Sequence, residues 1–105
     1  MLSIYLSMVE TEEEKDLVTE LYNTYKQILF NVSMSILHNT ADAEDAVQET
    51  FVRIISNLSK IDCANEKRSK AYIFVVTRNI CYDILRKKHK VVFLDDDREL
   101  VDTNA

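Results

Sequence analysis

Asp45, Gln48 and Glu49 lie three and four positions apart, so in an α-helix their polar ends gather on one turn. Two carboxylates beside an amide can bind a divalent metal ion, exchange protons in catalysis, or pair with basic side chains of a partner. A di-metal site in a helical bundle needs inward Glu residues and a Glu-x-x-His pair, and this sequence has no such pair. An ordinary solvated helix face is the remaining alternative for this turn.

A second cluster begins at Lys60, where the charge of the chain reverses. Residues 60–90 carry nine Lys or Arg against three acids, whereas residues 1–59 carry three against ten. Tyr72, Phe74 and Tyr82 lie within the basic stretch. Rings among cations are typical of surfaces that bind single-stranded nucleic acid, because the cations contact phosphates and the rings stack on bases. The net charge of −5 therefore averages over two surfaces that we expect to have different partners.

The composition excludes several classes of protein. The chain has no Gly and no Pro, so it contains no glycine-rich phosphate loop, and any turn with positive φ is expected at Asn or Asp. Cys63 and Cys81 are 18 positions apart, without metal-ligand spacing, and suit a reducing cytosol. Residues 1–9 are apolar but lack the basic start of a signal peptide, and no run approaches a membrane span. We expect a cytoplasmic monomer of one domain that is not an enzyme, with no metal, no cofactor and no membrane partner.

The elements that position these clusters are helices. Thr11–Glu14 is a capping box, and His38–Thr40 breaks the helical pattern, with Asn39 or Thr40 as the next cap. The first helix has an apolar stripe at Leu17, Leu21, Tyr25, Ile28, Val32 and Ile36. The second, from about Ala41 to Leu58, buries Ala43, Ala46, Val47, Phe51, Ile54, Ile55 and Leu58 and exposes Asp45, Gln48, Glu49, Arg53 and Ser56.

A third helix follows the polar loop from Lys60 to Ser69. Ser69 is its predicted cap, and it reaches to about Lys88, with residues 91–94 returning as an extended piece or short turn. Its core face is Ile73, Val76, Thr77, Ile80 and Ile84, and nearly opposite lie Tyr72, Val75, Asn79, Tyr82 and Arg86. The expected fold is a small all-α bundle of three principal helices, the first two antiparallel and the third packed across them. A short extra helix is allowed at either end.

Two motifs together resemble a known family. The first is Asp-Ala-Glu-Asp-Ala-Val-Gln-Glu-Thr-Phe-Val-Arg-Ile at residues 42–54, and the second is Ala-Tyr-Ile-Phe-Val-Val-Thr-Arg-Asn-Ile-Cys-Tyr-Asp-Ile-Leu-Arg-Lys-Lys at residues 71–88. In this order and separation they resemble the second conserved domain of bacterial RNA polymerase sigma factors, most of all the extracytoplasmic-function group. The resemblance covers roughly residues 17–90 and places that domain at residues 1–94.

The resemblance implies a role in transcription initiation with two partners. In the family, the first motif docks on a coiled coil of the largest catalytic subunit of RNA polymerase, and the matching core-polymerase-binding residues here are Asp45, Gln48, Glu49 and Arg53. The next loop and helix recognise and melt the minus-ten promoter element and hold a flipped base of the non-template strand. Here they span residues 60–69 and 70–88; Asn79 matches the family's Asn near the flipped base, and Arg78, Arg86, Lys87 and Lys88 match its basic positions. From their own chemistry we add to these DNA-binding residues Tyr72 and Tyr82, whose rings can stack on unstacked bases, and Arg68 and Lys70, which either contact phosphates or are solvated. An anti-sigma protein commonly covers the same faces in this group.

The sequence departs from the family pattern at several positions. Tyr72 stands where the family usually has Trp, Thr77 where it has a small residue, and Ile61 and Cys63 where Phe and Gly are common. Cys63 is either an ordinary thiol or a redox sensor. The family also carries a second helical domain with a helix-turn-helix, which nothing after Phe93 provides. Residues 95–105 resemble the acidic start of the linker between the domains, so we expect a disordered tail and a fragment of a longer protein.

Two other hypotheses remain open from the sequence. One is a helical protein-interaction module with no nucleic-acid role, whose basic helix binds an acidic partner. The other is a metal-dependent helical enzyme that holds a divalent ion at Asp45 and Glu49. The first differs from the promoter hypothesis in what the third helix would bind, and the second differs in requiring a metal ion on the second helix.

Overall fold

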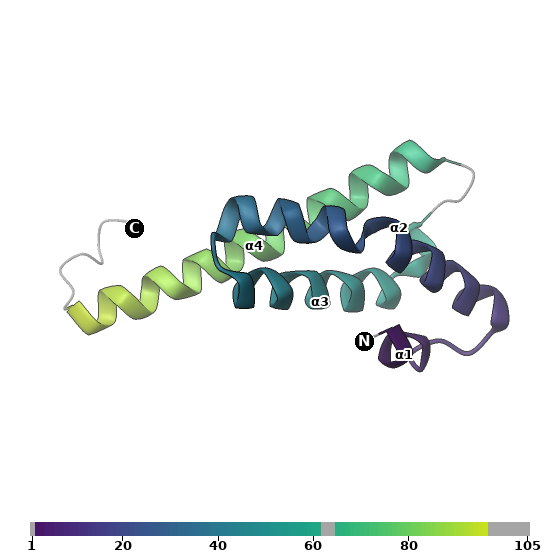
Figure 1. The fold of residues 1–105 in the computed structure, drawn as a ribbon, viewed down its shortest axis with the longest axis horizontal. Helices are drawn as coiled ribbons and strands as arrows, with labels where there is room; N and C mark the ends of the chain where they lie inside the picture. The colour runs from purple at the N-terminus through teal and green to yellow at the C-terminus, as the bar shows by residue number, and fades with distance from the viewer. Residues whose placement is uncertain (1, 62–64, 97–105) are drawn as a thin grey trace.

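The computed structural model describes residues 2–61 and 65–96, and the fold of these residues is all-α, as predicted (Figure 1). The elements are α1 (Leu2–Leu6), α2 (Glu12–Leu37), α3 (Thr40–Ser56), a single 3₁₀ turn η1 (Leu58–Lys60) and α4 (Glu66–Asp96). Helices α2 and α3 lie side by side as an antiparallel pair, and α4 crosses both (Figure 1). The short helix allowed at the N-terminus is α1.

The α2–α3 hairpin is set by local capping. The Thr11 side chain accepts a hydrogen bond from the Glu14 amide at 3.1 Å, and the Glu14 carboxylate accepts one from the amide of Glu10, the residue before the cap. At the other end, His38 adopts a left-handed conformation with φ 54° and ψ 31°, and its amide bonds to the Met34 carbonyl. Positive φ was expected at Asn or Asp, so this expectation was wrong. Asn39 then caps α3 by accepting from the Asp42 amide at 2.9 Å, as predicted.

The core at one end of the bundle is built around rings from three helices. Tyr5, Tyr22 and Phe51 contact one another with ring centroids 5.4 to 5.9 Å apart. Tyr5 is buried, so α1 completes this core. Burial raises the pKa of the Tyr5 hydroxyl, with the neighbouring Tyr22 adding to the rise. Phe51 is fully buried in this core, so its truncation to Ala would cost about 3–5 kcal/mol.

Helix α4 packs its predicted core face against the other two helices. Ile73, Val76, Thr77 and Ile80 are buried, and Ile84 packs against the same core. Buried hydroxyls are satisfied locally, because Thr50 and Thr77 each donate to the carbonyl four residues before them. The buried Cys81 thiol donates to the Ser33 hydroxyl at 3.4 Å and joins α4 to α2.

The predicted boundaries of the third helix were wrong at both ends. It begins at Glu66 rather than Ser69, because the Asn65 side chain accepts the Arg68 amide at 3.1 Å and acts as the cap. Ser69 lies buried inside the first turns. Residues 91–94 continue the helix instead of returning as an extended piece or turn. Helix α4 therefore extends beyond the α2–α3 pair at its C-terminal end (Figure 1).

The buried stripe of α2 differs from its prediction by about one residue. Leu21 and Tyr25 are buried as expected, but the following turns bury Leu29, Ser33 and Leu37 in place of Ile28, Val32 and Ile36. Residues 28–37 are apolar on more than one side, so the sequence offers two adjacent stripes. Packing against α4, as in the Ser33–Cys81 contact, selects between them. The expected disordered tail at 95–105 falls mostly on residues 97–105, outside the described residues.

Candidate functional site

The first predicted site lies on the solvent side of α3. Asp45, Gln48, Glu49 and Arg53 are all exposed, and we call these four residues the α3 face. Their spacing keeps them on adjoining turns of one helix. Arg53 donates to the Glu49 carboxylate at 3.0 Å, and both side chains are about half exposed. The α3 face thus offers one amide, one uncompensated carboxylate and one surface ion pair.

Sequence reasoning missed an apolar residue within the α3 face. Val52 is 42% exposed, and it follows Gln48 by four residues and Glu49 by three. Helical geometry therefore places its methyl groups among the polar residues of the α3 face. The signal was available, because Val52 follows Asp45 by seven residues, or nearly two turns. Val52 thus adds apolar area to a polar face, and protein interfaces combine an apolar core with a polar rim.

A groove borders the α3 face on its α2 side. It has a volume of about 420 Å³, and its lining includes Gln48, which belongs to the α3 face as well. We call it the ring-lined groove, because three of its residues are aromatic; the full lining is Tyr5, Tyr22, Lys26, Gln27, Phe30, Glu44, Val47 and Gln48. The Lys26 ammonium lies 4.9 Å from the centre of the Tyr22 ring, which is a cation–π contact.

The second predicted site lies along the outer side of α4. Val75, Asn79, Tyr82 and Arg86 are exposed and recur at three or four residues, and we call them the α4 face. Tyr82 is 48% exposed, so its ring is available to another molecule. The α4 face thus brings together an amide, a ring and a guanidinium along two to three turns of one helix.

Tyr72 differs from Tyr82 in its surroundings. Although predicted on the same stripe, Tyr72 is partly buried and packs against both apolar clusters of the core. Tyr72 lies near the margin of the α4 face, and part of its side chain is in the protein interior. Tyr72 therefore contributes to stability, whereas Tyr82 does not share this packing.

The cations at the end of α4 are held by acids of the protein. Arg86 donates to Asp83 at 2.9 Å, and the Lys87 ammonium lies 3.6 Å from the same carboxylate. The hydrogen bond from Arg86 and the positive charges of both residues hold the pKa of Asp83 below its ordinary value. Lys88 pairs instead with Asp42 of α3 at 2.7 Å. The two exposed pairs of Asp83, with Arg86 and Lys87, are weak enough to exchange for phosphate contacts.

The remaining predicted cations are exposed but do not all join the α4 face. Arg78 precedes Tyr82 by four residues and flanks the α4 face. Arg68 lies in the first turn of α4, eleven residues before Asn79, and so is roughly in line with the α4 face. Lys70 precedes the buried Thr77 by seven residues, so it points along the core side of α4 although its own side chain is exposed.

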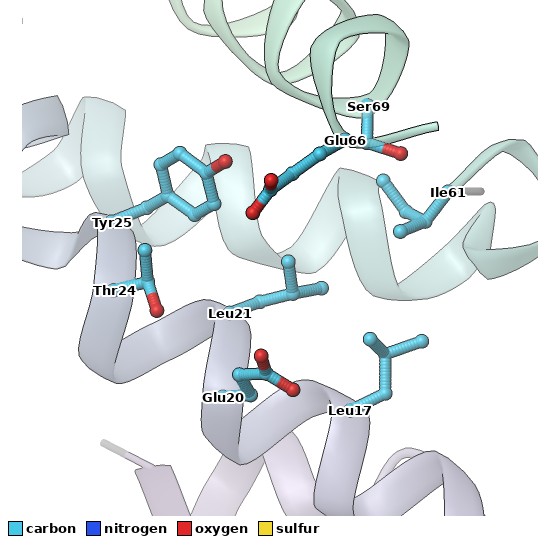
Figure 2. Close-up of a pocket in the computed structure, with 8 residues that line it drawn as sticks. All are labelled: Leu17, Glu20, Leu21, Thr24, Tyr25, Ile61, Glu66 and Ser69. Carbon is cyan, nitrogen blue, oxygen red and sulfur yellow. The ribbon is translucent and has the colours of Figure 1, made fainter. Parts of the chain in front are cut away.

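A smaller pocket separates the start of α4 from α2 (Figure 2). Its volume is about 150 Å³; it has an apolar base of leucine and isoleucine, and carboxylates project into it from both helices (Figure 2). Burial and the nearby Glu66 charge raise the pKa of the Tyr25 hydroxyl. No basic residue lines this pocket, so it repels phosphate; the lining is Leu17, Glu20, Leu21, Thr24, Tyr25, Ile61, Glu66 and Ser69.

Neither cavity is lined by Asn79 or Tyr82, so the base pocket implied by the resemblance coincides with neither cavity.

Among residues 2–61 and 65–96, no group of three or more His, Cys, Asp or Glu side chains is arranged to hold a metal ion. Within the same ranges, no helix has the length and apolar character needed to cross a membrane. Cys63 lies outside the described residues.

Comparison with known proteins identifies relatives for most of the chain. The profile of the Sigma-70 region 2 family matches residues 21–91. The ECF RNA polymerase sigma factor SigM of Bacillus subtilis (strain 168) is 31% identical over 80 residues, covering 76% of this chain and 47% of SigM. The ECF RNA polymerase sigma factor SigW of the same organism is 26% identical over 82 residues, covering 78% and 43%. RNA polymerase sigma factor SigV is 26% identical over 90 residues, covering 86% and 53%.

The chain spans about half the length of the curated relatives it matches. No solved structure is significantly similar to it.

Proposed function

Because this chain belongs to the Sigma-70 region 2 family and resembles ECF sigma factors, we propose that it binds core RNA polymerase and recognises and melts the minus-ten promoter element. The family is one of transcription initiation factors, not of known enzymes. The observation that carries the proposal is that the two motifs form two exposed surfaces on separate helices, one acidic and one basic with a ring.

The α3 face is the proposed polymerase contact. Asp45 and Glu49 supply negative charge, Gln48 supplies an amide, and Val52 supplies apolar area at the centre. Such a patch is complementary to a partner helix with basic side chains, because charge complementarity sets register and association rate, and burial of the Val52 side chain adds apolar contact. We assign this contact to a coiled coil of the largest catalytic subunit.

The α4 face is the proposed contact for the non-template strand. Melting requires a surface that binds the single strand better than the duplex, and cations alone bind both. An unstacked base can lie on Tyr82, which is worth about 1–3 kcal/mol, and the Asn79 amide can read the edge of an exposed base. Extruding a base costs a few kcal/mol. One stacking ring with contacts from Arg78, Arg86 and Lys87 to phosphates is sufficient to cover that cost.

The proposal also covers the compartment in which the protein acts and the partner that keeps it inactive. Its polymerase and promoter lie in the cytoplasm, where we place this chain as a monomer before it binds the enzyme. An anti-sigma protein that covers the α3 face or the α4 face would keep it inactive, because both partners need those surfaces free.

The experiment that tests the polymerase contact is a titration of purified core RNA polymerase against the labelled chain. The double variant Gln48→Ala/Glu49→Lys is expected to lose binding, since it removes the amide and reverses a charge on the α3 face. Glu13→Lys makes the same charge change at an exposed position in the first turn of α2 and serves as the matched control. Binding retained by the double variant, with an unchanged helical spectrum in both, would refute the proposal.

A further inference from the structure

We propose that the pocket between α2 and the start of α4 binds an alkylammonium group, with the charge at its carboxylates and the alkyl chain against its apolar base (Figure 2). We call it the α2–α4 pocket; it is the cavity of about 150 Å³ that both Glu20 and Glu66 line. This inference goes beyond the proposed function, because the residues that carry it belong neither to the α3 face nor to the α4 face.

Two carboxylates project into the pocket without a cation of the protein beside them. Glu20 comes from α2 and Glu66 from the first turn of α4 (Figure 2). Within residues 2–61 and 65–96, neither carboxylate forms an ion pair or a hydrogen bond. Lys70 follows Glu66 by four residues, a spacing that favours pairing along a helix, yet the two side chains do not pair. The negative charge of the pocket is therefore uncompensated and attracts a cationic ligand.

The Tyr25 hydroxyl is a buried polar group that a ligand can satisfy. Tyr25 is only 8% exposed, lines the α2–α4 pocket, and carries its hydroxyl on the side of the ring that faces Glu66 (Figure 2). An edge-on contact with Phe74, with ring centroids 6.4 Å apart, holds the ring in this position. In the described part of the chain the hydroxyl makes no hydrogen bond, although buried polar groups almost always have a partner.

The polar atoms of the pocket match an ammonium group. An ammonium carries N–H donors and no acceptor, and the pocket offers it two carboxylates and the Tyr25 hydroxyl oxygen. A metal ion fits less well, because among the described residues no third acidic, His or Cys side chain joins Glu20 and Glu66 to form a metal-binding group. The polar part of the pocket therefore selects an organic cation.

The apolar base of the pocket matches an alkyl chain. Leu17, Leu21 and Ile61 form this base, below the level of the carboxylates (Figure 2). Methylene groups that enter the pocket displace water from these side chains, as lysine stems do when they lie along apolar surface. The volume of about 150 Å³ exceeds the roughly 30 Å³ that one water molecule occupies in the liquid, so a butyl chain can enter.

The experiment titrates the whole chain with butylammonium chloride at pH 7 and constant ionic strength, followed by NMR. Shifts at Leu21, Tyr25 and Ile61 should saturate with a Kd of about 1–10 mM, as for other very small ligands. Butanol has the same alkyl chain without the charge and should bind at least about fivefold more weakly.

A lysine blocked at both ends presents the same group as a protein side chain does. Saturation by both butylammonium and the blocked lysine supports the proposal and extends the pocket to a lysine of a bound protein. Saturation by butylammonium alone also supports it and restricts the pocket to free amines.

Variants test which atoms hold the cation. Glu20→Gln and Glu66→Gln keep the shape of each side chain and remove its charge, so each should weaken butylammonium binding about three- to tenfold. Tyr25→Phe keeps the ring against Phe74, loses the hydroxyl, and should weaken binding about two- to threefold. Glu13→Gln is the matched control, because Glu13 is exposed and lines neither cavity; it should leave the Kd unchanged.

Three results would overturn the proposal. The first is an absence of saturable shifts with butylammonium. The second is butanol binding as tightly as butylammonium, which would mean that the carboxylates do not select the ligand. The third is an unchanged Kd in both Glu20→Gln and Glu66→Gln, which would place the amine elsewhere on the protein.

Discussion

The Lys88 ammonium lies 2.7 Å from the Asp42 carboxylate, which joins the late turns of α4 to the first turn of α3 across 46 positions of sequence. The side chain of Asp42 is only 23% exposed, whereas that of Lys88 is 52% exposed. This pair lies where α4 leaves the α2–α3 hairpin, so it helps to fix the direction of the projecting part of α4. The cation of Lys88 is thus engaged within the protein, although the residue falls in the basic stretch.

Removing the Lys88–Asp42 ion pair should lower the free energy of unfolding slightly, and by more when Asp42 is replaced than when Lys88 is replaced. Lys88→Gln loses one ion pair, whereas Asp42→Asn loses the pair and a negative charge in the first turn of α3, where the helix dipole favours it. A double-mutant cycle by urea unfolding should give a coupling free energy of about 0.2–1 kcal/mol, with the larger single effect at Asp42. The coupling should shrink at 1 M salt. A coupling of zero at low salt would show that the pair contributes nothing.

Replacing Asp83 should strengthen binding of single-stranded DNA. Asp83→Asn removes the carboxylate that holds Arg86 and Lys87, so both cations become available to phosphates. Because exposed ion pairs exchange readily for other contacts, the affinity for a minus-ten oligonucleotide should rise by a small factor, about two- to fivefold. Glu13→Gln, with the same loss of charge far along the sequence, is the control. An unchanged affinity would mean that these cations do not contact DNA.

The pH dependence of the contacts of Asp83 with Arg86 and Lys87 follows from the direction in which the pKa of Asp83 is shifted. The pKa of Asp83 is lower in the folded chain than its ordinary value, so the unfolded state takes up the proton first as pH falls. The ionised Asp83 carboxylate therefore stabilises the fold above the ordinary Asp pKa, and this stabilisation disappears as the pH drops through the pKa of Asp83 in the folded chain. Between pH 5 and 8 the carboxylate stays ionised, so Asp83→Asn should raise DNA affinity equally throughout this range.

Tyr82 and Tyr72 should behave differently when truncated. Tyr82→Ala should lose about 1–3 kcal/mol of single-strand binding without a change in melting temperature, because its ring is exposed, and Tyr82→Phe should retain binding. Tyr72→Ala should instead lower the free energy of unfolding by about 1–3 kcal/mol, since Tyr72 packs against both core clusters. A Tyr72→Ala variant of unchanged stability that loses DNA binding would reverse this assignment.

The sequence predicted α3 well because that helix is clearly amphipathic. Ala43, Ala46, Phe51 and Ile54 are buried and the α3 face is exposed, as their spacing required. The stripe of α2 was less predictable, since residues 28–37 are apolar on several sides and the choice between Ile28 and Leu29 depends on packing against α4. Helix propensity and local sequence pattern do not predict which stripe is buried, because tertiary contacts decide it.

Other features depend on contacts that a linear pattern does not contain. The role of α1 rests on Tyr5 reaching Tyr22 and Phe51, although the apolar residues 1–9 gave a hint of it. The pairing of Lys88 with Asp42 and the ring-lined groove both join segments far apart in sequence. The start of α4 was misplaced because Asn65 and Ser69 are both good caps, and only the hydrogen bond to Arg68 distinguishes them.

The Cys81 thiol should be unreactive in the folded chain. Burial raises its pKa, and the hydrogen bond with Ser33 acts in the opposite direction. In a Cys63→Ser background, reaction with Ellman's reagent at pH 8 should be at least about tenfold slower than in denaturant, because the thiolate is the nucleophile. Fast reaction in the native state would contradict burial.

The raised pKa of Cys81 also has a consequence for stability. The unfolded chain loses the thiol proton first as pH rises, so the stabilising effect is complete below the ordinary Cys pKa and decreases as pH climbs toward the folded pKa. The Cys63→Ser chain should therefore lose stability above about pH 9. A Cys63→Ser/Cys81→Ala chain should lose less over the same range, although it is less stable overall.

The central claim is that α3 and α4 present separate surfaces to separate macromolecules. Its most direct test measures two affinities, for core RNA polymerase and for a single-stranded minus-ten oligonucleotide, in Gln48→Ala/Glu49→Lys and in Asn79→Ala/Tyr82→Ala. The first variant should lose polymerase and keep the oligonucleotide, and the second should do the reverse. If both affinities fall together in either variant while the fold is intact, or if neither falls, two independent binding surfaces do not exist.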